Sequence, residues 1–175
     1  VPADLLSRWK KFQRTRANQW RRNDQRYNTD LMQAYRLYTL ALSGAAELSA
    51  MNRLRELDNL SIQTKWMLAA AYVKAGQPEA AKKIIANATT DVKPYQELGY
   101  SYGSDIRDRA IILETLVLLN EKVKAFEQVK ELSNALSNTN YWMSTQTAAY
   151  SLKAIGLFLE SEKRGALKYA YSHNG

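Results

Sequence analysis

The chain contains no cysteine and only one histidine, His173, among its 175 residues. Without cysteine there is no disulfide framework and no thiol nucleophile, and zinc sites built from cysteine and histidine are excluded. A Ser-His-Asp relay would have to take its base from His173, close to the end of the sequence. The absence of cysteine fits a bacterial envelope protein as well as a cytoplasmic one, so it does not decide the compartment.

Glycine and proline are also scarce, with seven and three residues respectively, which favours long helices over a sheet with many turns. No apolar run approaches the roughly 18 residues that a membrane-spanning helix needs. The length suits one domain with a substantial core, and we predict an all-α fold. Because the sequence opens with "VPADLL" and no methionine, we also expect a fragment of a longer protein.

Acidic residues are nearly absent from one segment of the chain. Between Arg8 and Arg26 there are eight basic residues and one acid, Asp24, so this segment has a net charge of +7 and the remaining chain is close to neutral. Residues 4–22 read as a helix with an apolar stripe at three- and four-residue steps, which predicts a face toward the core. The stripe consists of Leu5, Trp9, Phe12 and Trp20, interrupted by Arg16. The basic faces are most simply solvated; a membrane-surface or partner-docking helix and a nucleic-acid surface are the alternatives.

Periodicity and end signals predict a series of helical hairpins, in which a nearly all-apolar helix ends at a stop residue and a more amphipathic helix follows. The stops are Gly44, Gly76 and Asn120, separated by 32 and 44 residues, whereas a tetratricopeptide solenoid repeats every 34 or so. Concentric layers of helices therefore fit better than a thin superhelix. The predicted helices span 4–22, 31–44, 47–58, 62–76, 77–88, 105–121, 122–137 and 144–160, and the predicted N-caps are Asp4, Asp30, Ser61 and Ser144.

The stretch "YGSDIRDRA" concentrates charged side chains in one helical turn: Asp105, Arg107, Asp108 and Arg109. Paired carboxylates could perform acid–base chemistry. Helix N-termini also favour negative charge, however, and the adjacent arginines are expected to keep the carboxylates ionised. We therefore favour a cap with an ion-pair network that braces the preceding loop, with Arg107 partly buried.

The stretch "WMSTQTAAYSLKAIGLFLE" poses a similar choice. Ser144 or Thr145 could be a nucleophile, but no base or acid and no G-x-S-x-G elbow accompanies them. Ser144 is instead a natural helix cap. Because only Ser151 and Lys153 are polar among residues 148–159, we expect the helix to belong to the core.

Several segments together resemble one family. "QAYRLYTLALSG…LSAMNRLREL", "WMLAAAYVKAGQPEAAKKII", "YGSDIRDRAIILETL" and "WMSTQTAAYSLKAI" are similar, in the same order, to the thioester-domain region of bacterial alpha-2-macroglobulins. The resemblance runs from about Gln33 to about Glu160. It implies an α/α toroid of helical hairpins in one domain of an envelope protease inhibitor, which captures proteases through a Cys–Gln thioester. The thioester motif is absent here, and Gln146 is not its equivalent because no cysteine precedes it.

The resemblance also sets the remaining expectations. Residues 1–165 would form the C-terminal part of the helical domain, and 166–175 a tail leading into a neighbouring domain. The chain would be non-catalytic and periplasmic or envelope-associated, with no cofactor, metal, nucleic acid or small-molecule substrate. Its partners would be other domains of the same protein and, through the full-length protein, target proteases. Structural or interdomain contacts are expected from Ser144, Gln146, Asp105, Arg107, Asp108 and Arg109.

Two other functions stay open. The segment "LAAAYVKAGQPEAAKKII" on its own is typical of a tetratricopeptide-like protein-binding module. A toroidal enzyme acting on polysaccharide would rest only on Asp105, Asp108 and fold analogy. If the chain is part of a toroid, apolar helix faces should be exposed and the isolated chain should self-associate or be marginally stable.

Overall fold

The structure is a computed structural model that describes residues 2–22, 29–97, 103–138 and 143–162. Within these ranges the regular secondary structure is helical, as predicted, apart from one isolated bridge between Gln96 and Ser104. The helices are α1 (Ala3–Gln19), α2 (Thr29–Leu42), α3 (Leu48–Arg55), α4 (Ile62–Lys74), α5 (Pro78–Ile85), α6 (Asp105–Leu118), α7 (Lys122–Ser137) and α8 (Thr145–Glu162). The predicted tail, 166–175, lies outside the described residues, so the proposed domain boundary stays a prediction.

The local signals at Ser61, Gly44, Gly76 and Asn120 behave as predicted. The Ser61 hydroxyl accepts a hydrogen bond from the Thr64 amide at 3.2 Å and caps α4. Gly44 and Gly76 adopt φ angles of +75° and +76°, which a residue without a Cβ reaches without strain, and Asn120 adopts +60°. These three stops divide the chain into the hairpins that the sequence predicts.

Two predicted caps are wrong. The residue before α1 is Pro2, and Asp4 lies inside the first turn, where its carboxylate pairs with Arg8 at 2.9 Å. Asp30 is the second residue of α2, and its carboxylate accepts a hydrogen bond from Arg22 at 2.5 Å. In both cases an acidic side chain in the first turn of a helix pairs with a nearby guanidinium and does not cap a backbone amide. The predicted helix at 47–58 is also shorter, because α3 ends at Arg55.

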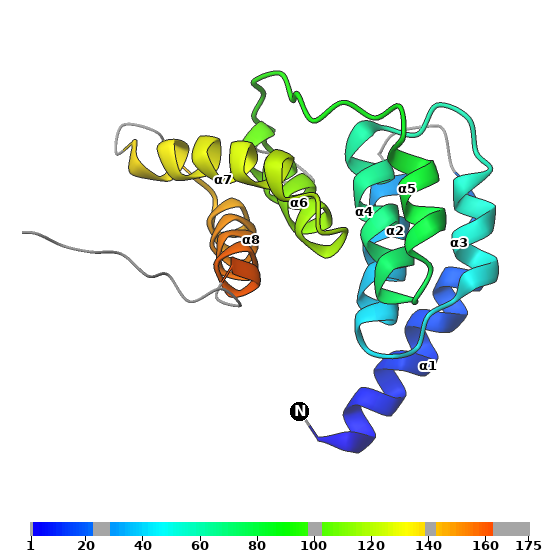
Figure 1. The fold of residues 1–175 in the computed structure, drawn as a ribbon. Helices are drawn as coiled ribbons and strands as arrows, with labels where there is room; N and C mark the ends of the chain where they lie inside the picture. Colours follow the sequence, from blue (N-terminus) through cyan, green and yellow to red (C-terminus); the bar gives the residue numbers. More distant parts are fainter. Residues whose placement is uncertain (1, 23–28, 98–102, 139–142, 163–175) are drawn as a thin grey trace, which may run out of the picture.

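The helices form two layers (Figure 1). Helices α2, α4, α6 and α8 follow one another as neighbours in a row, while α3, α5 and α7 each return along the outside of the row and α1 packs against α2 and α3. The row is curved. Neighbouring axes lie about 8–10 Å apart, so a flat row would separate α2 from α8 by roughly 25–30 Å. Instead the Tyr35 and Tyr150 rings meet edge-on with centroids 6.4 Å apart.

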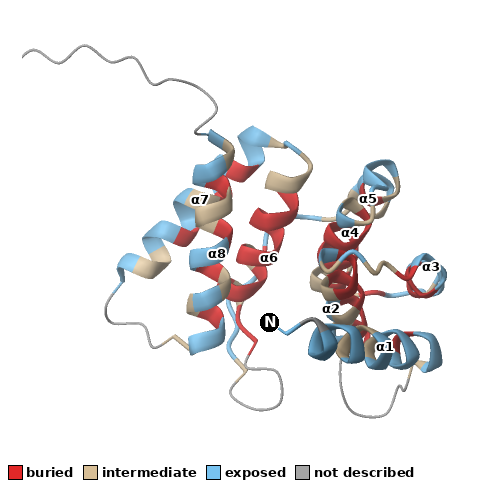
Figure 2. Ribbon diagram, turned by 90° about the horizontal axis from the view of Figure 1, so that it is seen from below, coloured by how far each residue is buried: buried red, intermediate tan, exposed pale blue. Residues whose placement is uncertain are grey.

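Burial follows this layering (Figure 2). Helices α4 and α6 are buried around most of their circumference, as their nearly all-apolar sequences predict. The expectation that the last helix belongs wholly to the core is wrong. Only one stripe of α8 is buried, formed by Thr147, Ser151, Ala154 and Phe158. Leu152 and Leu159 are 63% and 54% exposed, because no described helix covers that flank.

The predicted stripe on α1 is also misplaced. The fully buried residue is Ala17, with Trp9 and Trp20 half-buried beside it, whereas Leu5 and Phe12 are 51% and 60% exposed. The buried side of α1 is polar in part, since Gln33 of α2 donates a hydrogen bond to the Ala17 carbonyl at 2.9 Å. None of the helices in the described part of the chain combines the length and apolar character that crossing a bilayer requires.

Candidate functional site at the first turns of α6 and α8

The charged turn predicted at 105–109 forms a buried polar cluster centred on Asp108. Its side chain has no exposed surface. One carboxylate oxygen, Oδ2, accepts hydrogen bonds from the Tyr95 hydroxyl at 2.5 Å and from Gln63 Nε2 at 2.7 Å. The other, Oδ1, accepts from Arg107 Nη2 at 3.0 Å and Nε at 3.2 Å. The cluster therefore ties the start of α4 and the irregular connection before α6 to the first turn of α6.

Burial raises the pKa of the Asp108 carboxyl above its usual range, although hydrogen bonds from Tyr95 and Gln63 and the charge of Arg107 act in the opposite direction. The prediction that the arginines would outweigh any upward shift is therefore wrong for Asp108. The physical reason is that the sequence shows the neighbouring arginine but not the depth of burial. Burial and Asp108 together also raise the pKa of the Tyr95 hydroxyl, which stays a hydrogen-bond donor.

The stretches "YGSDIRDRA" and "WMSTQT" meet at this cluster. The Arg107 guanidinium, on a side chain that is 6% exposed, donates to Gln146 Oε1 at 3.4 Å and to the Tyr95 hydroxyl at 3.4 Å. Beside it, the hydroxyls of Ser104 and Thr147 lie 3.0 Å apart. The first turns of α6 and α8 are thus bonded to each other through side chains 39 to 43 residues apart in sequence.

Both helix starts have serine caps. Ser144 Oγ accepts from the Thr147 amide at 3.1 Å, which confirms its predicted role, and its hydroxyl also donates to Thr147 Oγ1 at 3.0 Å. The cap of α6 is Ser104, which accepts from the Arg107 amide at 3.1 Å, and not Asp105. The Ser144 hydroxyl is therefore engaged with its own helix, as a capping side chain is.

The other two predicted residues lie outside the cluster. Arg109 points to the outer layer, where it pairs with Glu131 of α7 and donates to the Val92 carbonyl at 2.9 Å. Asp105 is half-buried, and its Oδ1 has no hydrogen-bond partner among the described residues. Asp105 and Asp108 therefore do not form a facing pair of carboxylates with a shared environment.

The sequence did not predict a second ion pair, which is buried on its glutamate side only. The Glu114 carboxylate of α6 accepts from Lys153 Nζ of α8 at 3.0 and 3.1 Å and from the Tyr38 hydroxyl of α2. Lys153 Nζ also donates to the Tyr38 hydroxyl at 2.9 Å. Glu114 and Tyr38 are buried, whereas the Lys153 side chain is 43% exposed. The sequence does contain a hint of this cluster. Glu114 is a charged residue within a nearly all-apolar helix, and a buried charge requires a partner.

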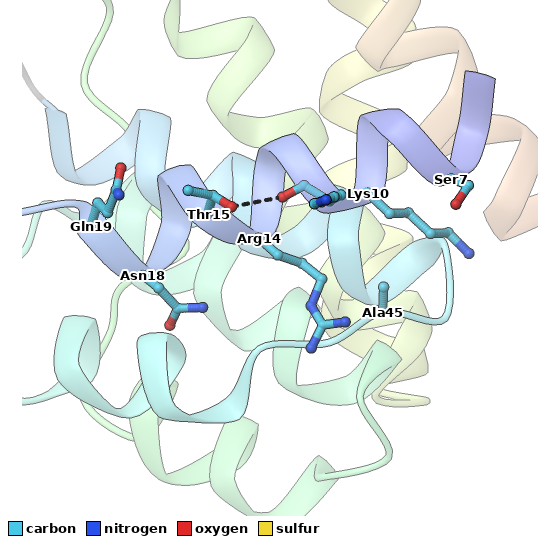
Figure 3. A pocket seen from close by; sticks show the side chains of 8 residues that line it. Ser7, Lys10, Arg14, Thr15, Asn18, Gln19 and Ala45 are labelled. Atoms are coloured by element: carbon cyan, nitrogen blue, oxygen red, sulfur yellow. Dashed lines mark hydrogen bonds between the residues drawn. The ribbon is translucent and has the colours of Figure 1, made fainter. Parts of the chain in front are cut away.

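The exposed side of α1 borders a hollow of about 640 Å³ (Figure 3). It is lined by Ser7, Lys10, Lys11, Arg14, Thr15, Asn18, Gln19 and Ala45. Glu47 lies at the edge of the hollow, where its carboxylate accepts hydrogen bonds from Arg14 and, at 3.0 Å, from Asn18 Nδ2.

Within the described residues, no group of three or more His, Asp or Glu side chains is arranged to hold a metal ion.

Comparison of the chain with protein-family models, with curated proteins and with solved structures finds no match. The polar cluster at α6 and α8 is buried and internally bonded, so the described geometry suits bracing of the helix starts more than contact with a substrate.

Proposed function

We propose that the chain is a non-catalytic, helical thioester-type domain of a bacterial alpha-2-macroglobulin-like protease inhibitor of the cell envelope. In this proposal the domain is part of an α/α toroid and works as a scaffold against other domains of the same protein. Target proteases are bound by the full-length protein. The proposal begins from the collinear resemblance of four segments to that family.

The observation that best supports the proposal is the meeting of two of those segments. "YGSDIRDR" and "WMSTQT" are widely separated in sequence, yet Arg107 and Gln146 share a hydrogen bond and Ser104 lies against Thr147. Sequence similarity that includes these two helix starts is understandable if the starts brace each other. Their residues would then be retained for structure at the rim of the domain.

Strong curvature of the helical row also favours a toroid. Residues of α2 reach side chains of α8, three positions along the row, through Tyr38–Lys153 and Tyr35–Tyr150. A shallow superhelical groove would keep these helices apart. Gln146 hydrogen-bonds to Arg107, and the chain has no cysteine, so covalent capture would require residues outside this chain.

The test uses the full-length parent protein with a broad-specificity protease. We expect limited cleavage of the parent, followed by loss of protease activity toward a large protein substrate. If a thioester lies elsewhere in the parent, pretreatment with methylamine should abolish covalent protease adducts on a denaturing gel. The isolated 175-residue chain is the control and should not inhibit. Unchanged protease activity, with progressive digestion of the parent, would contradict the proposal.

The exposed flank of α7 and α8 predicts self-association of the isolated chain. Val123 and Phe126 are 77% and 61% exposed on α7, and Leu152 and Leu159 are 63% and 54% exposed on the contacting helix α8. Apolar surface of this kind favours association in water. We expect concentration-dependent oligomers in sedimentation velocity, and the double variant Phe126→Ser/Leu152→Ser should shift them toward monomer. Phe12→Ser, on the distant helix α1, is the matched control; an equal shift for this control would refute the assignment to α7 and α8.

The second candidate function is a tetratricopeptide-like binding module. It is favoured by the similar form of hairpins α4–α5 and α6–α7, each turning at a residue with positive φ, Gly76 and Asn120. Such a module should bind an extended peptide along the row of α2, α4, α6 and α8, whereas the inhibitor domain should not. A peptide-array screen followed by titration separates the two functions.

A further inference from the structure

Helix α1 differs from the other helices in how little of it is covered. Among the described helices its main neighbours are α2 and α3, and its first half projects beyond the bundle (Figure 1). Its 17 residues give a length of about 25 Å. Among residues 4–19 of this helix, Ala17 alone is buried. Most of the helix surface is therefore free to contact something outside the described chain.

That surface combines apolar and cationic side chains. Leu5, Leu6 and Phe12 are 51%, 37% and 60% exposed, and Trp9 is half-buried next to them. Around them lie the exposed cations of the helix, Arg8, Lys11, Arg14 and Arg16. The acidic groups nearby are few: Asp4 pairs with Arg8, and Glu47 pairs with Arg14. Lys11 and Arg16 have no acidic partner among the described residues.

We propose that α1 is an interfacial helix that binds an anionic lipid surface. Its cations would contact lipid phosphate groups, while Leu5, Leu6 and Phe12 enter the boundary between headgroups and acyl chains. This combination is typical of helices that lie in the plane of a membrane surface, where electrostatic attraction and burial of apolar side chains act together.

The cations of α1 complement a negatively charged partner. The exposed apolar side chains of the helix favour a lipid surface over a nucleic acid as that partner. A nucleic-acid surface gains from cations on phosphates and from aromatic rings that stack on bases. The aliphatic side chains of Leu5 and Leu6 would contribute nothing to stacking, and leaving them exposed to water would be unfavourable. At a membrane surface, by contrast, Leu5, Leu6 and Phe12 would all be removed from water at the boundary between headgroups and acyl chains. The inference does not depend on the proposed inhibitor function.

The test is flotation of the 175-residue chain with vesicles of phosphatidylcholine alone and of phosphatidylcholine mixed with phosphatidylglycerol. We expect binding to the anionic vesicles, weakening as salt is raised, and little binding to the zwitterionic ones. Arg8→Gln/Arg16→Gln should weaken binding about tenfold or more because two cations are removed. Leu5→Ser/Phe12→Ser should also weaken it about tenfold at unchanged charge.

Matched controls come from α7, where cations and an apolar side chain are also exposed. Lys124→Gln/Lys130→Gln and Val123→Ser should leave vesicle binding unchanged. Equal binding to both vesicle types would overturn the proposal. The same holds if the α7 control variants weakened vesicle binding as much as the α1 variants do. Binding to a DNA duplex that responds to the arginine variants but not to Leu5→Ser/Phe12→Ser, with no vesicle binding, would assign α1 to nucleic acid instead.

Discussion

Replacing Asp108 by asparagine is expected to lower the free energy of unfolding by about 3–5 kcal/mol, the typical loss when one partner of a buried ion pair is removed. The substitution keeps the size of the side chain but leaves the Arg107 guanidinium, on a side chain only 6% exposed, without its carboxylate. Its remaining described partners, Tyr95 and Gln146, are neutral and lie at 3.4 Å. Urea unfolding followed by circular dichroism measures the loss.

The matched control for this prediction is Asp91→Asn. Asp91 also lies beside an arginine, 3.7 Å from Arg109, but its side chain is 83% exposed. Solvent screens this pair, so its loss should change stability by less than about 0.5 kcal/mol. If Asp108→Asn were as mild as the control, the cluster would not brace the domain.

Hydrogen exchange shows which segments are loosened by the Asp108→Asn substitution. Asp108 bonds Tyr95 in the connection before α6 and Gln63 at the start of α4. Hydrogen exchange should therefore quicken in the described part of that connection, 89–97, and in the first turn of α6 more than in α7. Uniform acceleration across all helices would indicate global destabilisation without a bracing role for the cluster.

Replacing Lys153 by methionine has the second-largest expected effect, a loss of about 1–3 kcal/mol. Glu114 would stay buried with the Tyr38 hydroxyl as its described partner, since both lysine hydrogen bonds would be gone. The loss is smaller than at Asp108 because the Lys153 side chain is 43% exposed, and water reaches part of the pair. Lys122→Met, which breaks an exposed pair with Glu162 at 3.2 Å, is the control and should be nearly neutral.

A double-mutant cycle separates the pair from its surroundings. Glu114→Gln in the Lys153→Met background removes the unpaired charge, so it should recover part of the lost stability. Additive losses would mean that the two side chains are not coupled. Because Tyr38, Glu114 and Lys153 come from α2, α6 and α8, a coupled result would also support the curvature of the helical row.

The positions of the helices were predictable to within about one turn, because the forces at a helix end are local. A serine cap such as Ser61 or Ser144 lies three residues from the amide that it satisfies, and Gly44 and Gly76 mark where the backbone turns to positive φ. The same locality explains the failures at Asp4 and Asp30. Each has the right residue type near a helix start, but Arg8 or Arg22 competes for the carboxylate.

Burial was less predictable, because periodicity identifies an apolar face without identifying its neighbour. The exposed residues Leu5 and Phe12 share a stripe with Trp9, but α2 and α3 cover the side of α1 that contains Ala17. In α8, Leu152 is as apolar as a core residue, yet no described helix packs on it. The ion pair between Glu114 and Lys153 was not predicted, because the two residues are 39 positions apart in the sequence.

The sequence by itself determined an all-helical chain of hairpins, their stops and the serine caps Ser61 and Ser144, because these depend on contacts within one or two helical turns. The concentration of basic charge in one segment was equally visible. Only the tertiary structure decided that α2, α4, α6 and α8 form a curved row and that Arg107 and Asp108 meet Gln146, Tyr95 and Gln63. These contacts join distant segments, and desolvation, which sets the pKa direction of Asp108, depends on the whole surrounding fold.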